Sequence, residues 1–484
     1  MATAANLEPK AVPPTLVAQG KRRWPETAYL IVLLIGTFAV FAPTLRFGFV
    51  FDDISQIVEN PHLTSWKYLP TYFTEHVWAQ NRTTTPVYYR PLFLVMMRLD
   101  YILFGLQPWG WHLSLVLLHL LACVAVFYFL RYIAGQKIAL IATAIFALHP
   151  IHAEAVSWLA CLAEPLMTAA LLTSFLFYLK AEKNWLWWSA GLYAVALLLK
   201  ETAIVWPLFL FLAAYDGFER TLRKTLPFWL MAAFYFVIRS LVVPMPRVGV
   251  MPEMLMPGAL VQYVWHLLLP VELSPGYDTP TGYAYLVAAI AIICGFIYIA
   301  RINKLCRMAV LLLAIPMLPV INVGFMSHDY VHDRYLYLPS VGFALLVAMV
   351  LAKAPKTVLI VLFALFCAGS ISEARPWRDE IHLFTRAVQM DPASFNLRNH
   401  LALAYIDADR CTEAMPLLKQ AVVQEPYAFQ VYVNLADCYE RMGQIDDALR
   451  SWGTAEMLWP DREIELNIER LRKLRAQQSH STAP

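Results

Sequence analysis

Charged residues are scarce in this sequence of 484 amino acids: Asp, Glu, Lys and Arg make up 15% of it, against about 25% in a typical soluble domain. Apolar residues make up 59%, and the mean hydropathy is +0.53. A water-soluble fold cannot enclose that fraction of apolar side chains, so many of them must face lipid. The composition therefore excludes a soluble enzyme and a disordered protein.

A large net charge and paired cysteines are also lacking. The net charge of +3 is too small for a surface that binds nucleic acid, so no such partner is expected. The seven cysteines are scattered without a C-x-x-C pair or a metal-ligand spacing, and Cys123 and Cys161 lie in or beside apolar runs. We expect no disulfide framework and no zinc site.

Apolar runs divide the first 372 residues into candidate membrane spans. A helix needs about 20 apolar residues to cross a bilayer, and several runs reach this length only with semi-polar neighbours. The eleven candidates are 28–45, 111–130, 138–149, 164–179, 185–199, 202–216, 226–242, 283–300, 308–320, 336–352 and 357–372. Two more runs, 91–106 and 258–270, contain charges or prolines and are interpreted as interfacial or re-entrant. We expect an all-α, polytopic membrane helical bundle over 28–372.

The distribution of Lys and Arg predicts the orientation of this bundle. With residues 1–27 in the cytoplasm, the inner segments hold 16 Lys and Arg in 59 residues, and the outer segments hold 8 in 136. This bias follows the positive-inside rule. An odd number of spans then places the C-terminus on the outer side, together with the long first loop, 46–110.

A repeat follows the last apolar run. Pro392, Pro426 and Pro460 are spaced 34 residues apart, and the same offset relates Ala387 to Ala421. This period, with small residues where paired helices touch and Pro after the second helix, is the tetratricopeptide pattern. Residues 373–484 are predicted to form a short tetratricopeptide helical solenoid on the outer side, with a capping helix over 461–477. Because two repeats are few for a free-standing solenoid, we expect them to pack on the membrane body as a docking surface or a lid.

Two adjacent carboxylates follow the first span, in F-D-D-I-S-Q-I-V-E-N-P. Asp52 and Asp53 are suited to act as a general base or to hold a cation. A solvated turn is equally compatible with the pattern, because the Asn60-Pro61 pair favours a turn. Both interpretations stay open on spacing alone.

The segment H-P-I-H-A-E-A-V-S-W follows the third span and carries His149, His152 and Glu154, with Glu164 at the start of the next span. Proline disrupts the helical spacing that would align both imidazoles on a metal ion. Each His is therefore better interpreted as an interfacial, hydrogen-bonded side chain. Glu154 is the stronger candidate for a functional site, because no Lys or Arg lies between 137 and 180 to pair with it locally.

Two further clusters contain a basic residue between apolar runs or in the first loop. In L-L-L-K-E-T-A, Lys200 and Glu201 could pair with each other, or the lysine could hold a lipid-linked phosphate. Arg90 stands in Y-Y-R-P of the first loop and is a weaker candidate, because basic residues flank many spans.

The fifth cluster, S-H-D-Y-V-H-D-R-Y-L-Y-L-P-S, precedes the tenth span. It contains His328, Asp329, Asp333, Arg334 and Tyr335. Arginine offers planar, paired donors that suit a phosphate. So many polar groups directly before an apolar helix favour a functional site over a solvated loop.

All five clusters lie on the outer side of the predicted topology. A charge in or beside hydrocarbon costs about 2.5–3.5 kcal/mol on insertion scales, which makes each cluster a functional candidate. Together they predict a cleft in which a carboxylate deprotonates an acceptor hydroxyl and cations stabilise a departing lipid phosphate. That arrangement suits transfer of a group from a lipid-phosphate carrier.

The body over 29–372 resembles the TMTC proteins (transmembrane and tetratricopeptide-repeat proteins) and their bacterial relatives. These proteins are similar to the protein O-mannosyltransferases and share the GT-C glycosyltransferase fold. The resemblance rests on F-D-D-I-S-Q-I-V-E-N-P-H (51–62), Y-R-P-L (89–92), H-P-I-H-A-E-A-V-S-W (149–158), L-K-E-T-A-I (199–204) and D-R-Y-L-Y-L-P-S-V-G-F (333–343).

The resemblance implies transfer of a sugar, commonly mannose, from a polyprenyl-phosphate donor to a protein Ser or Thr hydroxyl. It implies no cofactor and no required metal, and a divalent ion held by Asp52 and Asp53 stays open. It implies that Asp52 and Asp53 are catalytic and that Lys200 and Arg334 contact the donor phosphate. The other binding candidates are Arg90, His152, Glu154, Glu201, Asp333 and Tyr335. Leu162 stands where the family usually has Arg, which leaves the identity of the substrate open.

Two other classes of protein agree less well with the sequence. A non-enzymatic membrane scaffold would recruit outer partners through the repeats, but it would leave five polar clusters on one face without a purpose. A transporter predicts polar residues near mid-bilayer and related halves, which the sequence does not show. The short repeat tail favours a bacterial cytoplasmic membrane with periplasmic repeats, and an endoplasmic-reticulum membrane would give equivalent geometry.

Overall fold

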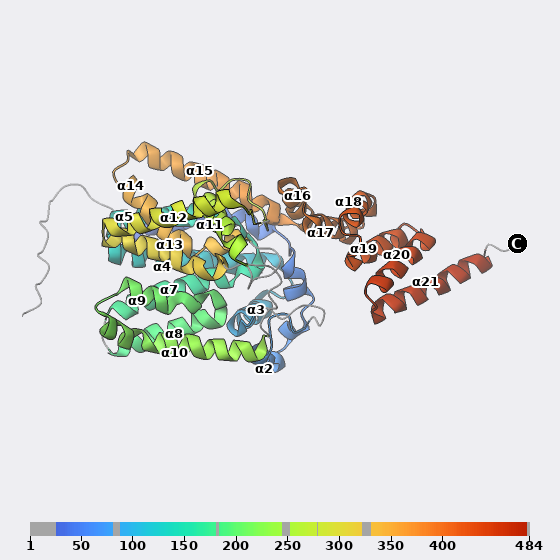
Figure 1. Ribbon diagram of the computed structural model, residues 1–484, viewed down its shortest axis with the longest axis horizontal. Helices are drawn as coiled ribbons and strands as arrows, with labels where there is room; N and C mark the ends of the chain where they lie inside the picture. Colours follow the sequence, from blue (N-terminus) through green and yellow to red (C-terminus); the bar gives the residue numbers. More distant parts are fainter. Residues whose placement is uncertain are drawn as a thin grey trace, which may run out of the picture.

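The computed structural model describes residues 26–80, 88–180, 183–243, 252–277, 279–321 and 331–481 (Figure 1). Within these ranges the chain is all-helical, as the sequence predicts, and one isolated antiparallel bridge joins Tyr277 to Val331. Two candidates of the fifth polar cluster, His328 and Asp329, lie outside the described residues.

The body is a bundle of roughly aligned helices, and the C-terminal helices project from one end of it (Figure 1). The α-helices of the body are α1 (Glu26–Phe41), α2 (Leu69–Thr74), α3 (Pro91–Phe104), α4 (Pro108–Ala134), α5 (Gln136–Leu148), α6 (Ala153–Ser157), α7 (Ala163–Leu179), α8 (Lys183–Leu199), α9 (Trp206–Ala213), α10 (Phe218–Val242), α11 (Pro252–Leu268), α12 (Tyr283–Ile302), α13 (Lys304–Ile321), α14 (Pro339–Leu351) and α15 (Lys356–Ala374). Short 3₁₀ helices that bear on the site are η6 (Leu159–Cys161), η7 (Glu201–Val205), η9 (Asp333–Leu336) and η10 (Arg375–Arg378).

Among the described residues, seven helices are long and apolar enough to cross a membrane, and α5 with the bent segment after it could form an eighth. Three shorter apolar helices cover Asn184–Leu199, Glu201–Ala213 and Pro339–Leu351. Each of the eleven runs predicted from the sequence overlaps one of these helices. The chain is therefore a multi-pass membrane protein, and the count of eleven crossings stays a prediction because the short helices fall below the usual spanning length.

Small residues and hydroxyls hold the body helices close together. Ser174 on α7 and Ser189 on α8 each donate a hydrogen bond to the other's carbonyl oxygen, at 2.8 and 2.7 Å. Gly342 on α14 faces α13 so closely that an added Cβ would lie 2.3 Å from the Ala309 carbonyl oxygen. Small and hydroxyl side chains are the usual contacts between membrane helices, because lipid gives no hydrophobic force between them.

The C-terminal part, here called the tail, consists of α16 (Glu380–Met390), α17 (Phe395–Asp407), α18 (Cys411–Gln424), α19 (Phe429–Arg441), α20 (Ile445–Leu458) and α21 (Arg462–Ser481). The starts of α17 and α19 are 34 residues apart, as are those of α18 and α20. The turns between the paired helices also repeat, since Asp409 and Gly443 both have positive φ, at 58° and 73°. The tetratricopeptide assignment and the boundaries of the domains stay predictions, and α21 covers most of the expected capping helix.

The tail packs on the body through a shared apolar cluster. Val50, Trp158 and Cys161 from the body bury their side chains against Trp377 and Phe384 of the tail region. The ring of Trp158 stacks on that of Trp377 with centroids 5.6 Å apart. The start of the tail is thus fixed to the loops around Val50 and Trp158.

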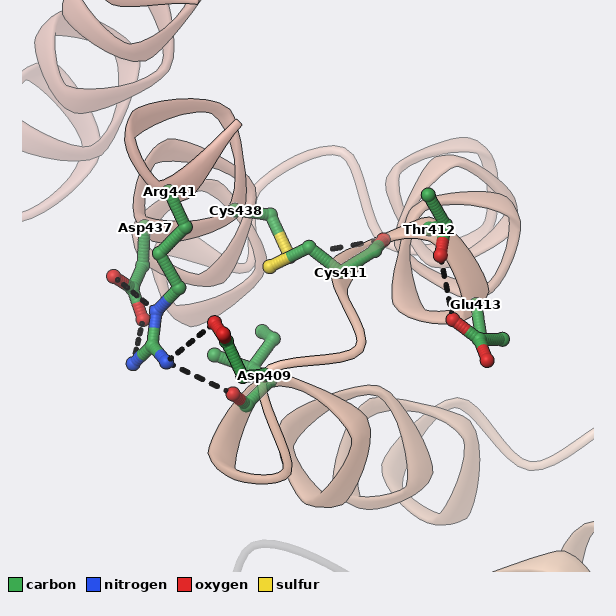
Figure 2. Close-up of a disulfide and its surroundings, with 8 residues drawn as sticks. Asp409, Cys411, Thr412, Glu413, Asp437, Cys438 and Arg441 are labelled. Atoms are coloured by element: carbon green, nitrogen blue, oxygen red, sulfur yellow. Dashed lines mark hydrogen bonds and ion pairs between the residues drawn. A yellow bond between two sulfur atoms is a disulfide. The ribbon is translucent and has the colours of Figure 1, made fainter. Parts of the chain in front are cut away.

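One expectation about cysteine was wrong. Cys411, at the start of α18, and Cys438, in α19, form a disulfide with Cα atoms 5.3 Å apart (Figure 2). Both cysteines are buried. The pairing escaped the sequence analysis because 27 residues separate the two positions, and only the packing of successive helix pairs brings them together.

Gly342→Ala tests the close approach of α14 and α13. The added methyl would meet backbone atoms of α13, and overpacking of this kind costs about 1–3 kcal/mol. We expect a clearly lower midpoint of thermal unfolding in detergent. Gly295→Ala on α12 is the matched control, because nothing lies within 4 Å of its added Cβ. Equal midpoints for the two variants would contradict this packing.

Candidate active site

Three ion pairs join segments that are far apart in the sequence. Their members come from all the polar clusters except the Asp52–Asp53 pair: Arg90 with Glu201, Lys200 with Glu164, and Arg334 with Glu154. All six side chains are at most 17% exposed. Because a buried charge without a partner is strongly destabilising, these pairs fix the relative positions of the four clusters that supply them.

The pair of Arg334 and Glu154 is joined by two hydrogen bonds. Glu154 accepts from the Arg334 guanidinium at 2.5 Å and from the Arg334 backbone amide at 2.9 Å. The guanidinium also lies over two aromatic rings, 4.7 Å from the centroid of Trp158 and 4.9 Å from that of Tyr335. The carboxylate and the two rings together orient the guanidinium, which also lines a recess.

A recess is lined by residues from all five polar clusters. It has an empty volume of about 450 Å³, part of which is open to solvent. Its polar lining includes Asp52, Gln56, Arg90, Glu164, Lys200, Arg334 and Tyr335. The predicted convergence of the clusters is therefore present, and the recess lies beside Trp158, at the end of the bundle where the tail is attached.

The two adjacent aspartates differ sharply in their surroundings. Asp52 is partly exposed and lines the recess. Asp53 is fully buried, and its two carboxylate oxygens accept from the backbone amides of Val50, at 3.2 Å, and Ala160, at 3.0 Å. Asp53 thus joins the first loop to the loop around Ala160, and Asp52 is the carboxylate that a bound substrate could reach.

Burial raises the pKa of Asp53, the hydrogen bonds from Val50 and Ala160 oppose this rise, and the charge of Asp52 adds to it. A carboxyl group with no exposed surface and with both oxygens bonded to backbone amides is poorly placed to take a proton from an incoming hydroxyl. The structure therefore favours Asp52 over Asp53 as a base.

Gln56 is a further polar group in the recess. The residue is 6% exposed, and its amide oxygen has no hydrogen-bond partner among the described residues. A buried acceptor without a partner costs about 1–3 kcal/mol. A hydroxyl of a bound ligand would satisfy this oxygen.

Several predicted site residues lie behind the recess. Glu154 and Glu201 act as ion-pair partners of Arg334 and Arg90. Asp333 accepts hydrogen bonds from the Tyr277 hydroxyl at 2.8 Å and contacts His266 at 2.7 Å, away from the recess lining.

The candidate His152 lies deep in the helix core. It is 1% exposed and lies 3.2 Å from the Ser340 hydroxyl. Leu162, where the resemblance expects Arg, is fully buried in the main core. Neither residue lines the recess.

Sequence reasoning did not select Tyr88, Gln56, Trp158 or Cys161, all of which line the recess. All four stand inside or beside the quoted motifs, so their position was a usable signal. No group of three or more His, Cys, Asp or Glu side chains in the described part of the chain is placed to hold a metal ion.

A second recess adjoins the first. The two share Glu164, Lys200 and Tyr335, and the second is otherwise lined mainly by apolar side chains of α7, α13 and the segment that leads into α14. The Lys200–Glu164 ion pair therefore lies between a polar recess and a largely apolar one.

A family model described as "Dolichyl-phosphate-mannose-protein mannosyltransferase" matches residues 86–244. The chain is also similar to "Protein O-mannosyl-transferase TMTC3" of Mus musculus (26% identity, 89% of this chain, 54% of that protein) and of Homo sapiens (25%, 89% and 55%). A shorter match to TMTC4 of Homo sapiens reaches 33% identity over 36% of this chain and 27% of that protein. The resemblance to the TMTC proteins is thereby confirmed. The chain spans little more than half the length of the TMTC3 relatives that it matches.

Among solved structures, ArnT from Cupriavidus metallidurans aligns with 88% of this chain and 80% of its own at 14% identity. The TM-score is 0.43 for the form bound to undecaprenyl phosphate and 0.45 for the apo form. Scores of this size do not assign the fold.

Asp53→Asn tests the difference between the two aspartates. An amide has one acceptor oxygen, so one of the two backbone amides would lose its partner, at a cost of about 1–3 kcal/mol. We expect a lower midpoint of thermal unfolding for Asp53→Asn and little change for Asp52→Asn. Equal shifts for the two variants would contradict the assignment of Asp53 as the buried link.

Proposed function

We propose that this protein is a membrane glycosyltransferase that moves a sugar from a polyprenyl-phosphate donor to a protein Ser or Thr hydroxyl. The observation that carries the proposal is the recess in which Asp52 stands with three cations, Arg90, Lys200 and Arg334. The similarity to protein O-mannosyltransferases supports mannose as the sugar.

Asp52 is the proposed general base. It takes the proton from the acceptor hydroxyl, whose oxygen forms a bond to the anomeric carbon of the sugar. The bond from that carbon to the phosphate oxygen breaks, and its electron pair leaves with the lipid phosphate. The products are a glycosylated protein and a polyprenyl phosphate, so no oxidant or further reactant is required.

The three cations are proposed to stabilise the phosphate as its charge increases. Each is already oriented by a buried carboxylate, so little reorganisation is needed when the phosphate arrives. Lys200 has further donor hydrogens beyond its bond to Glu164, and its ammonium lies 4.9 Å from the Tyr335 ring centroid. Arg334 and Arg90 offer planar donors of the kind that phosphate oxygens accept.

The apolar recess beside Lys200 is proposed to take the first part of the polyprenyl chain. Its walls come mainly from apolar side chains of the membrane body, which suit a polyprenyl chain. Gln56 is proposed to accept a hydrogen bond from a sugar hydroxyl on the polar side.

The repeats and the recess are proposed to face the outer, oxidising side of the membrane. Disulfides persist in oxidising compartments and are rare in the cytosol, so the Cys411–Cys438 bond supports an outer tail. Because the tail packs on the loop of Val50 and on Trp158, the recess belongs to the same side.

Asp52→Asn is the decisive test of the activity. In proteoliposomes with radiolabelled polyprenyl-phosphate-mannose and an acceptor protein, we expect transfer to fall by about 10²-fold or more, the size of a general-base contribution. Asp446→Asn, an exposed tail residue paired with Arg475, is the control and should keep wild-type rates. Full activity in Asp52→Asn would refute the assigned base. A wild type without transfer from mannose, glucose or amino-arabinose donors would favour a scaffold.

A count of reactive thiols tests on which side of the membrane the tail lies. The structure has five free cysteines and one disulfide among seven cysteines. Cells are quenched with acid, and the protein is denatured and treated with a maleimide polymer that adds to each free thiol. We expect five labels per chain without reductant and seven after reduction. The double variant Cys411→Ser/Cys438→Ser should add five labels in both conditions. Seven labels on the wild type without reductant would place the tail in a reducing compartment.

A further inference from the structure

Phe51, the residue before Asp52, has an unusual backbone conformation. Its φ is 54°, in the left-handed region that bulky residues rarely adopt. Such a conformation costs about 1–3 kcal/mol and persists only where surrounding contacts hold it. The contacts of Phe51 therefore determine where the Asp52 carboxylate points.

Two hydrogen bonds, one at Phe51 and one at Gly48, join this loop to the segment where the tail begins. The Phe51 amide donates a hydrogen bond to the Glu380 carboxylate at 3.0 Å, and the Gly48 amide donates to the Arg378 carbonyl oxygen at 3.0 Å. Glu380 is the first residue of α16, and Arg378 ends η10. The first loop of the body is thus hydrogen-bonded to the start of the tail on both sides of Val50.

The ring of Phe51 is held by both parts of the molecule. It stacks on Trp158 of the body, with centroids 5.4 Å apart, and meets Phe384 and His400 of the tail edge-on at 5.6 and 5.3 Å. Aromatic pairs in these geometries contribute about 0.5–1.5 kcal/mol each beyond the area they bury. The ring cannot turn without breaking a contact with the tail.

We propose that Glu380 is a positioning residue that holds Asp52 in its productive orientation through the Phe51 amide. This inference rests on the proposed role of Asp52 as the base. Glu380 is not among the residues that line the recess, so it acts on the reaction through the loop. The tail is in this way a structural part of the active site.

The required property of Glu380 is an acceptor oxygen, not its charge. Burial raises the pKa of Glu380, and the hydrogen bond from Phe51 opposes that rise. A glutamine at this position keeps an acceptor oxygen of the same reach. Glu380→Gln therefore preserves the bond to Phe51, and Glu380→Ala removes it.

The test measures transfer kinetics for Glu380→Ala, Glu380→Gln and the control Glu440→Ala, whose glutamate pairs with Arg470 inside the tail. A base displaced by about 1 Å can lose as much as 10²-fold in rate. We expect Glu380→Ala to lower kcat by about 10-fold or more with an unchanged KM for the lipid donor, because the cations that hold the donor are untouched. Glu380→Gln and Glu440→Ala should keep wild-type kcat.

A wild-type kcat in Glu380→Ala would overturn the proposal, and so would a fall in kcat for Glu440→Ala equal to that for Glu380→Ala. A fall in Glu380→Gln as large as that in Glu380→Ala would also overturn it, because the acceptor oxygen would then be irrelevant. Thermal midpoints for the same proteins separate a loss of folded enzyme from a loss of rate.

Hydrogen exchange separates this inference from the proposed function. Glu380→Ala should speed exchange of amides in the 48–54 peptide by about 5-fold or more, the smallest factor expected when a buried amide loses its acceptor. Glu440→Ala should leave that peptide unchanged. Unchanged exchange in Glu380→Ala would refute the positioning role even if the protein proves to be a glycosyltransferase. Faster exchange with no transfer by the wild type would refute only the activity.

Discussion

The pairing of buried charges is the constraint on which this structure depends. The side chains of Arg90, Lys200 and Arg334 are at most 13% exposed, and an unpaired charge with so little access to water is costly. Each is matched by a glutamate from another segment, at separations of 111, 36 and 180 residues along the chain. Because every pair closes a different loop of the bundle, the loss of one partner would disturb both the fold and the recess.

Much of the site was predictable because charge is rare in this chain. In a sequence with 15% charged residues, polar clusters between apolar runs are conspicuous, and the positive-inside bias predicts that they lie on one side. Their convergence on one recess follows that expectation. The starts of successive tail helix pairs likewise recur every 34 residues, the period that the sequence shows. Both signals are periodic or compositional, so one sequence is enough to read them.

The roles of individual residues within the clusters could not be predicted, because they depend on tertiary contacts between distant segments. Asp52 and Asp53 are chemically identical neighbours, and only the amides of Val50 and Ala160 distinguish them. His152 stands in a motif with Glu154 yet points into the helix core. Glu380 lies 329 residues from Phe51 in a polar segment that gives no local signal. The disulfide depends in the same way on the packing of helices.

The shared wall between the two recesses has a consequence for the kinetics of the proposed enzyme. Its two substrates are dissolved in different phases, one in the bilayer and one in water. The Lys200–Glu164 pair stands where the polar recess and the largely apolar recess meet. In the proposed reaction the polyprenyl carrier occupies the apolar recess and the acceptor the polar one, so neither substrate has to displace the other. Such an enzyme has no obligatory order of binding, and its rate responds independently to the carrier density in the membrane and to the acceptor concentration in solution.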